Sequence, residues 1–213
     1  MIEEIFKKRK HVREYDTSVE ISSELIDSLL RKTWSMTPSK NQFMPYTAHV
    51  LGNQHQEYKD IVLDICRAKD NTPFTNPEFL HMKTCSYMII FTLRHEDEPN
   101  EEMFRRMSKR IVYEQSSSKL LNKHPANAFL ELGLFVNTLT GLCLENSIDV
   151  SYTRCFLEDR SKWKSAGLTF IDETPMLVLT MGKGHSYRVD AAKEEGWFDT
   201  DLKPEYERIV NFI

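Results

Sequence analysis

Residues 7–15, which read KKRKHVREY, concentrate cationic side chains that could bind an anion. An arginine guanidinium offers a planar fork of donors that suits phosphate, and a lysine ammonium offers a point charge. The same charges would also suit a solvated helix end, because they complement the dipole of a helix that ends there. The pattern leaves both interpretations open, and its candidate binding residues are Arg9, Lys10, His11 and Arg13.

Residues 37–46, which read TPSKNQFMPY, form a predicted loop in which adjacent polar side chains stand between two prolines. Proline restricts the backbone, so these polar groups would be held ready for a ligand. A polar turn is the alternative, because proline, serine and asparagine are also ordinary turn residues. The candidate binding residues of this loop are Pro38, Ser39, Lys40 and Asn41.

Several kinds of chemistry are not indicated by the sequence. It contains no G-x-G-x-x-G, Walker, H-E-x-x-H or G-x-S-x-G motif. The seven histidines do not recur at metal-ligand spacing, so no metal site is predicted, and His49 and His81 are expected to be surface or hydrogen-bonded core groups. No Ser/His/Asp or Cys/His set can be assembled, and no catalytic side chain is therefore predicted.

A nucleic-acid-binding module is a remoter alternative, based on residues 7–13 and on FRRMSKR at 104–110. The second stretch lies among glutamates and lacks interleaved aromatic residues, which favours a solvated helix face. The net charge of -4 gives no general attraction to nucleic acid or to an anionic membrane. We therefore expect neither as a partner.

The chain has 213 residues, of which 40% are hydrophobic and 28% charged, and these values indicate a single soluble domain. Its four cysteines are far apart, and three lie in apolar surroundings, as is typical of buried thiols in a reduced compartment. No apolar run follows the basic N-terminus, and the other apolar stretches are too short to span a bilayer. A cytoplasmic location is the prediction.

Hydrophobic periodicity predicts helices that interleave with about four strands. Four segments are predicted to be helical with one apolar side or apolar nearly all round: 2–10, 22–34, 54–68 and 126–144. The predicted strands are 46–51, 86–93, 148–156 and 175–181. Further helical segments are predicted at 101–121 and 158–164, and residues 205–212 form a final amphipathic segment. The arrangement is typical of a sheet flanked by helices.

Taken in order, the two polar stretches resemble the nitroreductase family of FMN-dependent oxidoreductases. Residues 9–13 are similar to the family's R-R-S-x-R phosphate motif, and residues 38–46 to its P-S-x-x-N-x-Q-P-W loop. Within that loop Asn41 comes one residue early, Met44 stands in place of glutamine and Tyr46 in place of tryptophan. Residues 127–150 resemble the family's long central helix, and the stretches ETPMLVLTMGKG and LKPEYERIV resemble its last core strand and its C-terminal segment.

The resemblance implies an α+β fold, an α/β/α sandwich with a mixed, mostly antiparallel sheet of four or five strands. It implies one FMN-binding domain over residues 1–213, with 96–124 as a variable helical excursion near the substrate pocket. It also implies a homodimer in which FMN lies at the subunit interface, with loop 38–46 reaching the flavin of the other subunit.

The same resemblance extends the set of cofactor-binding candidates. Asn127 matches a polar flavin contact of some members. Residues 151–155, which read SYTRC at the end of the third predicted strand, match the backbone that approaches the flavin ring, although arginine and cysteine replace the usual Glu-Gly. Lys203 matches a C-terminal basic group near the flavin phosphate, with Arg188 as the alternative. The added candidates are Asn127, Tyr152, Thr153, Arg154, Cys155 and Lys203.

The activity implied is NAD(P)H oxidation through bound FMN, with a nitroaromatic, a quinone or a similar acceptor reduced in ping-pong order. No side-chain acid or base need be essential in such an enzyme. Two alternatives stay open: a flavin-binding protein without turnover, and another branch of the family such as a reductive dehalogenase or an ene reductase. The choice between NADH and NADPH is not predicted.

Overall fold

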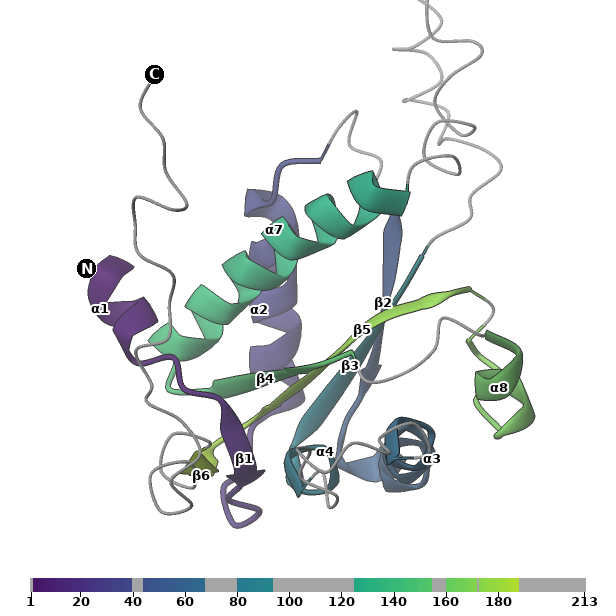
Figure 1. Ribbon diagram of the computed structural model, residues 1–213. Coiled ribbons are helices and arrows are strands. Elements are labelled where there is room, and N and C mark those ends of the chain that lie inside the picture. The colour runs from purple at the N-terminus through teal and green to yellow at the C-terminus, as the bar shows by residue number, and fades with distance from the viewer. Residues whose placement is uncertain are drawn as a thin grey trace, which may run out of the picture.

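The computed structural model describes residues 2–39, 44–67, 80–93, 125–154, 160–171 and 173–187 (Figure 1). Its elements in chain order are α1 (Ile2–Lys7), β1 (Val12–Tyr15), α2 (Ser23–Met36), β2 (Tyr46–Leu51), the 3-10 turn η2 (Asn53–His55), α3 (Gln56–Arg67), α4 (Leu80–Thr84), β3 (Tyr87–Leu93), α7 (Pro125–Glu145), β4 (Asp149–Thr153), α8 (Arg160–Ser165), β5 (Pro175–Gly182) and β6 (Gly184–Tyr187). The predicted segments 101–121 and 205–212 lie outside the described residues.

The main sheet has four strands in the order β2-β3-β5-β4, and every pairing in it is antiparallel. The central strand β3 pairs with both neighbours, and its five middle residues are buried. A strand covered on both faces needs apolar side chains on both faces, which explains the nearly continuous apolar run YMIIFTL. The prediction of a four- to five-stranded, mostly antiparallel sheet is confirmed.

Helices cover both faces of this sheet. Figure 1 shows α7 and α2 on one side and α3, α4 and α8 on the other. On the first side, Leu139 of α7 and Leu29 of α2 pack with Phe91 of the sheet. On the second side, Val62 of α3 and Trp163 of α8 pack with sheet residues of the second core. The predicted α/β/α sandwich is therefore confirmed.

Helix α7 is apolar nearly all round because it serves this core. Residues Ala128–Glu145 have a mean hydropathy of 1.3 and are long enough to cross a membrane, but 56% of this window is buried within the fold. Leu132 and Leu139 are almost fully buried, whereas Leu130 is 66% and Leu134 43% exposed. The helix thus packs one side on the sheet and presents a second apolar strip outward.

The start of α2 follows the sequence prediction closely. Ser22 lies just before the helix, and its hydroxyl accepts a hydrogen bond from the backbone N–H of Leu25. Such a cap satisfies one of the backbone donors that the first turn leaves unpaired. Ile26 and Leu29 then face the core one turn apart.

Three short elements were not predicted. Strands β1 and β6 pair antiparallel in a separate two-stranded sheet, and α4 precedes β3. β1 reads VREY, with two charged residues in its middle, so no apolar pattern marks it. The first helix also ends earlier than predicted, at Lys7 instead of Lys10. The cationic residues 9–11 consequently lie in the connection between α1 and β1.

Candidate functional site

The end of β4 gathers side chains from the first cationic stretch. The guanidinium carbon of Arg9 lies 5.6 Å from the centre of the Tyr152 ring. Tyr152 is held in turn by a hydrogen bond between its hydroxyl and that of Thr140 on α7. A guanidinium over an aromatic face is an attractive cation–π contact. The contact brings the first predicted motif against the stretch whose backbone is predicted to approach the flavin ring.

Thr153, the residue after Tyr152 on β4, faces the buried His81. The Nε2 atom of His81, on α4, lies 2.9 Å from Oγ1 of Thr153, and both residues are buried. On its other side the His81 ring lies 6.1 Å from the ring of His11, centre to centre. Thr153 is thereby linked through His81 to the start of β1.

Burial and the neighbouring charges keep His81 neutral. Burial, which is the largest cause, and the positive charges of His11 and Arg13 together lower its pKa to about 4. A buried cation beside other cations is costly, so the imidazole gives up its proton instead. At neutral pH, His81 therefore contributes hydrogen bonding to this cluster without adding charge.

An apolar groove lies on the opposite side of the β4 end. It has a volume of about 260 Å³ and is lined by Phe129 and Val136 of α7, by Tyr152, and by Met176 of β5. Arg154, the residue after β4, also lines it, and its guanidinium carbon lies 4.5 Å from the centre of the Phe129 ring. The groove thus has apolar walls and a cationic rim.

The proline-flanked loop is anchored on α7 as well. The hydroxyl of Ser39 donates to Oε2 of Glu131, 2.6 Å away, and accepts from the backbone N–H of Met44 at 2.9 Å. Glu131 is 8% exposed. Pro38 is exposed beside it. The Ser39 hydroxyl therefore ties the two ends of the loop to each other and to α7.

The structure brings together some of the predicted site residues and separates one of them. Arg9, His11 and Arg13 lie near the β4 end, together with Tyr152, Thr153 and Arg154. Lys10 points elsewhere, with its Nζ 4.7 Å from the centre of the Tyr187 ring on β6. Asn127 lies in the first turn of α7, where the backbone alone is described. The remaining candidates lie outside the described residues: Lys40, Asn41, Cys155, Arg188 and Lys203.

Sequence reasoning did not assign His81, Phe129 or Glu131 to the site. His81 was expected to be a surface or satisfied core group, and its hydrogen bond to Thr153 confirms the second of these. No local sequence signal marks the contact of His81 with Thr153, because α4 is only five residues long and Thr153 is 72 residues away. Phe129 and Glu131 belong to the predicted central helix, but neither was selected as a cofactor-binding candidate.

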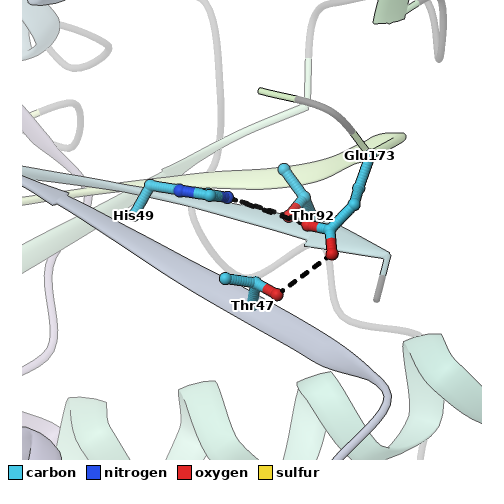
Figure 2. Close-up of polar contacts among 4 residues, drawn as sticks. All are labelled: Thr47, His49, Thr92 and Glu173. Carbon is cyan, nitrogen blue, oxygen red and sulfur yellow. Dashed lines mark hydrogen bonds and ion pairs between the residues drawn. The ribbon is translucent and has the colours of Figure 1, made fainter. Parts of the chain in front are cut away.

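A second polar cluster lies at the β2 edge of the sheet, and Figure 2 shows its four residues. Thr92 donates to Oε2 of Glu173 at 2.5 Å and lies 3.1 Å from Nε2 of His49. Thr47 donates to Oε1 of the same carboxylate at 3.3 Å. Glu173 precedes β5, so these bonds fasten the chain before β5 to the two neighbouring strands. Thr92 is fully buried and cannot meet a substrate, which indicates a structural role.

The donor set at the β4 end suits a flavin nucleotide. A phosphate needs cations and N–H donors, which Arg9, His11 and Arg13 can supply. An isoalloxazine ring needs flat apolar walls with polar groups at its edge, as the groove beside Tyr152 and Arg154 provides. Among the described residues, no three His, Cys, Asp or Glu side chains gather as a metal site would require.

No protein-family model matches the sequence, and no curated protein matches it. Solved structures do match. One is named as that of a candidate nitroreductase in complex with FMN, from Exiguobacterium sibiricum 255-15, with a TM-score of 0.72, 17% identity and coverage of 100% of this chain and 97% of that one. Another is named as a candidate NAD(P)H:FMN oxidoreductase from Staphylococcus epidermidis ATCC 12228, with a TM-score of 0.70, 15% identity and coverage of 100% and 96%.

A third match is an enone reductase of a gut-bacterial fatty acid saturation metabolism, CLA-ER, with a TM-score of 0.61 and 14% identity over 94% of this chain and 98% of that one. These alignments span nearly the full length of both chains. The protein therefore has the nitroreductase fold, as the sequence resemblance implied. Two of the three structures are named for FMN.

Proposed function

We propose that this protein is an FMN-dependent NAD(P)H oxidoreductase that reduces a nitroaromatic, a quinone or a similar acceptor. The observation that carries the proposal is the convergence of the cationic residues before and within β1 on the last residues of β4. Arg9 covers Tyr152, and His81 joins Thr153 to His11. The solved structures named for FMN and for NAD(P)H:FMN oxidoreduction support the same conclusion.

In this proposal Arg9, His11 and Arg13 bind the phosphate and ribityl part of FMN, with Lys203 or Arg188 as a further cation. The groove beside Phe129 and Tyr152 holds the ring. Bound FMN supplies the hydride chemistry, accepting from NAD(P)H and giving to the second substrate in ping-pong order. The chain's own part is to bind and orient FMN and the substrates and to exclude water, so no side-chain acid or base is assigned. Arg13 favours negative charge that develops on the cofactor.

We propose further that the chain acts as a homodimer. Leu130 and Leu134 form an exposed strip on α7, and Trp34 and Met36 on α2 are 64% and 57% exposed. Large apolar side chains that remain exposed on two packed helices are typical of an interface with a partner. A second copy of the chain on this surface would bring its loop 38–46, anchored by Ser39, toward the neighbouring flavin.

The rest of the proposal concerns the whole chain. Residues 1–213 form one FMN-binding domain in which 96–124 contribute a helical excursion near the substrate. The compartment is the cytoplasm, where thiols stay reduced. This agrees with Cys66, Cys85 and Cys143, which are buried free thiols. Burial raises the pKa of Cys85 and of Cys143 to about 12, so neither is a reactive thiolate at neutral pH.

The test is the absorption spectrum of the purified protein after loading with FMN and removal of free flavin, taken before and after anaerobic addition of NADH or NADPH. The expected result is a bound flavin spectrum that bleaches with one or both nucleotides and recovers when a quinone is added. A protein that retains no flavin would contradict the proposal. Retained flavin that neither nucleotide bleaches would instead support a flavin-binding protein without turnover.

Enone reduction is a second candidate, favoured by the structural match to an enone reductase. The same reduced protein should be mixed with an α,β-unsaturated ketone and with a nitroaromatic in separate experiments. Faster reoxidation by the enone would assign the protein to enone reduction, and faster reoxidation by the nitroaromatic would support the first proposal.

A further inference from the structure

Helix α4 is braced at its C-terminal end by one partly buried and one buried set of contacts. The hydroxyl of Thr84 accepts a hydrogen bond from the backbone N–H of Tyr15 on β1, at 2.9 Å. The fully buried ammonium of Lys59, from α3, donates to the carbonyl oxygens of Cys85 at 2.9 Å and Ser86 at 3.0 Å. Carbonyl groups at a helix end need such donors when water is excluded. The helix is thereby fixed to both α3 and β1.

The N-terminal end of α4 presents His81 to β4. Its side chain is 7% exposed and bonds the hydroxyl of Thr153, which is 4% exposed. The His11 ring and the Arg13 charge face the imidazole from the β1 side. His81 is therefore a side chain whose contacts join the start of β1 to the last residue of β4.

The position of this bond matters because Thr153 is where the regular structure of β4 ends. The next residue, Arg154, lines the groove, and its side chain lies over Phe129. A bond that is buried at both partners holds one geometry, since neither group can exchange it for water. Fixing Thr153 consequently fixes the direction in which the chain leaves β4, between the cations and the groove.

We propose that His81 is a positioning residue of the cofactor site, which holds the end of β4 against the cationic residues of β1 through its hydrogen bond to Thr153. The inference rests on the proposed FMN site and adds a residue to it. His81 is assigned no contact with the cofactor and no proton transfer. Its effect is on how tightly and in what electronic environment FMN is held.

The experiment uses Thr153→Val, which removes the hydroxyl at nearly constant shape, and Thr92→Val as the matched control. Thr92 bonds His49 as Thr153 bonds His81, and it also bonds Glu173, so the control loses at least as much hydrogen bonding. Three quantities are measured for each variant: the urea midpoint without FMN, the FMN dissociation constant from quenching of flavin fluorescence, and the absorption maxima of the bound flavin.

Both variants are expected to unfold at lower urea. Only Thr153→Val should weaken FMN binding, by roughly tenfold, and shift the absorption maxima. If Thr153→Val does not fold, His81→Gln and His81→Leu replace it. Glutamine can still bond Thr153 and should retain most of the affinity, whereas leucine should not.

Two results would overturn the positioning role of His81. In both cases, FMN binding by the wild type would leave the proposed function standing. One is an unchanged dissociation constant in Thr153→Val and His81→Leu. The other is an equal loss in Thr92→Val, which would make the effect one of general stability. A wild-type chain that binds no FMN would overturn the proposed function itself, and this inference with it.

Discussion

Thr92 and Thr153 point to the same face of the four-stranded sheet, near opposite edges, and each lies within hydrogen-bonding distance of a histidine. The shared face follows from the register. Thr153 pairs with Val178, Val178 pairs with Ile90, and Thr92 is two residues beyond Ile90 on β3. Directly paired residues and residues two apart on a strand share a face. The two His–Thr pairs are thus built alike.

Their surroundings differ in the sign of the charge. His49 lies 3.8 Å from the Glu173 carboxylate, whereas His81 faces His11 and Arg13. Burial lowers the pKa of His49, but Glu173 acts to raise it, while at His81 burial and both neighbours act in one direction. The charges around each pair, more than the pair itself, therefore separate the structural cluster at His49 from the proposed anion site at His81.

The largest expected effect is a loss of stability in acid that is specific to His81. An unfolded histidine titrates near 6.5 and the folded His81 at about 4, so between these values the unfolded chain binds a proton that the folded chain does not. Stability is therefore fully present above pH 6.5 and falls as the pH drops toward 4, by on the order of 3 kcal/mol.

Urea unfolding at pH 7.5 and pH 4.5 would measure this loss, with His81→Gln as the control. Carboxylates titrate in the same window, and subtracting the control removes their contribution. The difference in unfolding free energy between the two pH values should be smaller in the variant. An equal pH dependence in wild type and variant would show that His81 keeps its ordinary pKa in the folded protein.

A smaller effect is expected at the other cluster. Glu173→Leu removes the acceptor of Thr92 and Thr47 and should lower the unfolding free energy by about 2 kcal/mol at pH 7. The dissociation constant for FMN should not change, because the cluster lies at the β2 edge and outside the proposed site. A tenfold weaker FMN complex with unaltered stability would reverse the roles assigned to the two clusters.

The smallest effects are shifts of the two histidine pKa values in opposite directions. Glu173→Gln removes a charge that raises the pKa of His49, so that pKa should fall. Arg13→Gln removes a charge that lowers the pKa of His81, so that pKa should rise. Histidine ring signals in NMR spectra would follow both titrations. Shifts of the same sign would contradict the electrostatic difference between the clusters.

The main sheet and its long helices were predictable because their patterns are local. The apolar run of β3, the periodic face of α2 and the long, almost entirely apolar stretch of α7 each extend over enough residues to exclude other structures. β1 was not predictable, since Arg13 and Glu14 interrupt its pattern and its pairing partner β6 lies far along the chain.

The cationic candidates of the site could be selected from the sequence, and their role in binding an anion stays a prediction. The contacts that support them could not be predicted. Arg9 and His11 could be selected because cations in a short stretch are visible in a sequence. The contact of Arg9 with Tyr152 and the bond of His81 to Thr153 arise only when α4, β1 and β4 pack together. Ser39 was expected to contact the flavin, and that contact stays a prediction, but its anchoring by Glu131 required the tertiary structure.

The most direct test of the central claim is a titration of the wild-type protein and of Arg13→Gln with FMN, followed by quenching of flavin fluorescence. The account predicts saturable binding of one FMN per chain by the wild type. Binding by the variant should be at least about tenfold weaker, because a charge-assisted contact is lost. Absence of saturable quenching in the wild type, or equal dissociation constants for the two proteins, would contradict the claim that the cations beside β4 hold the cofactor.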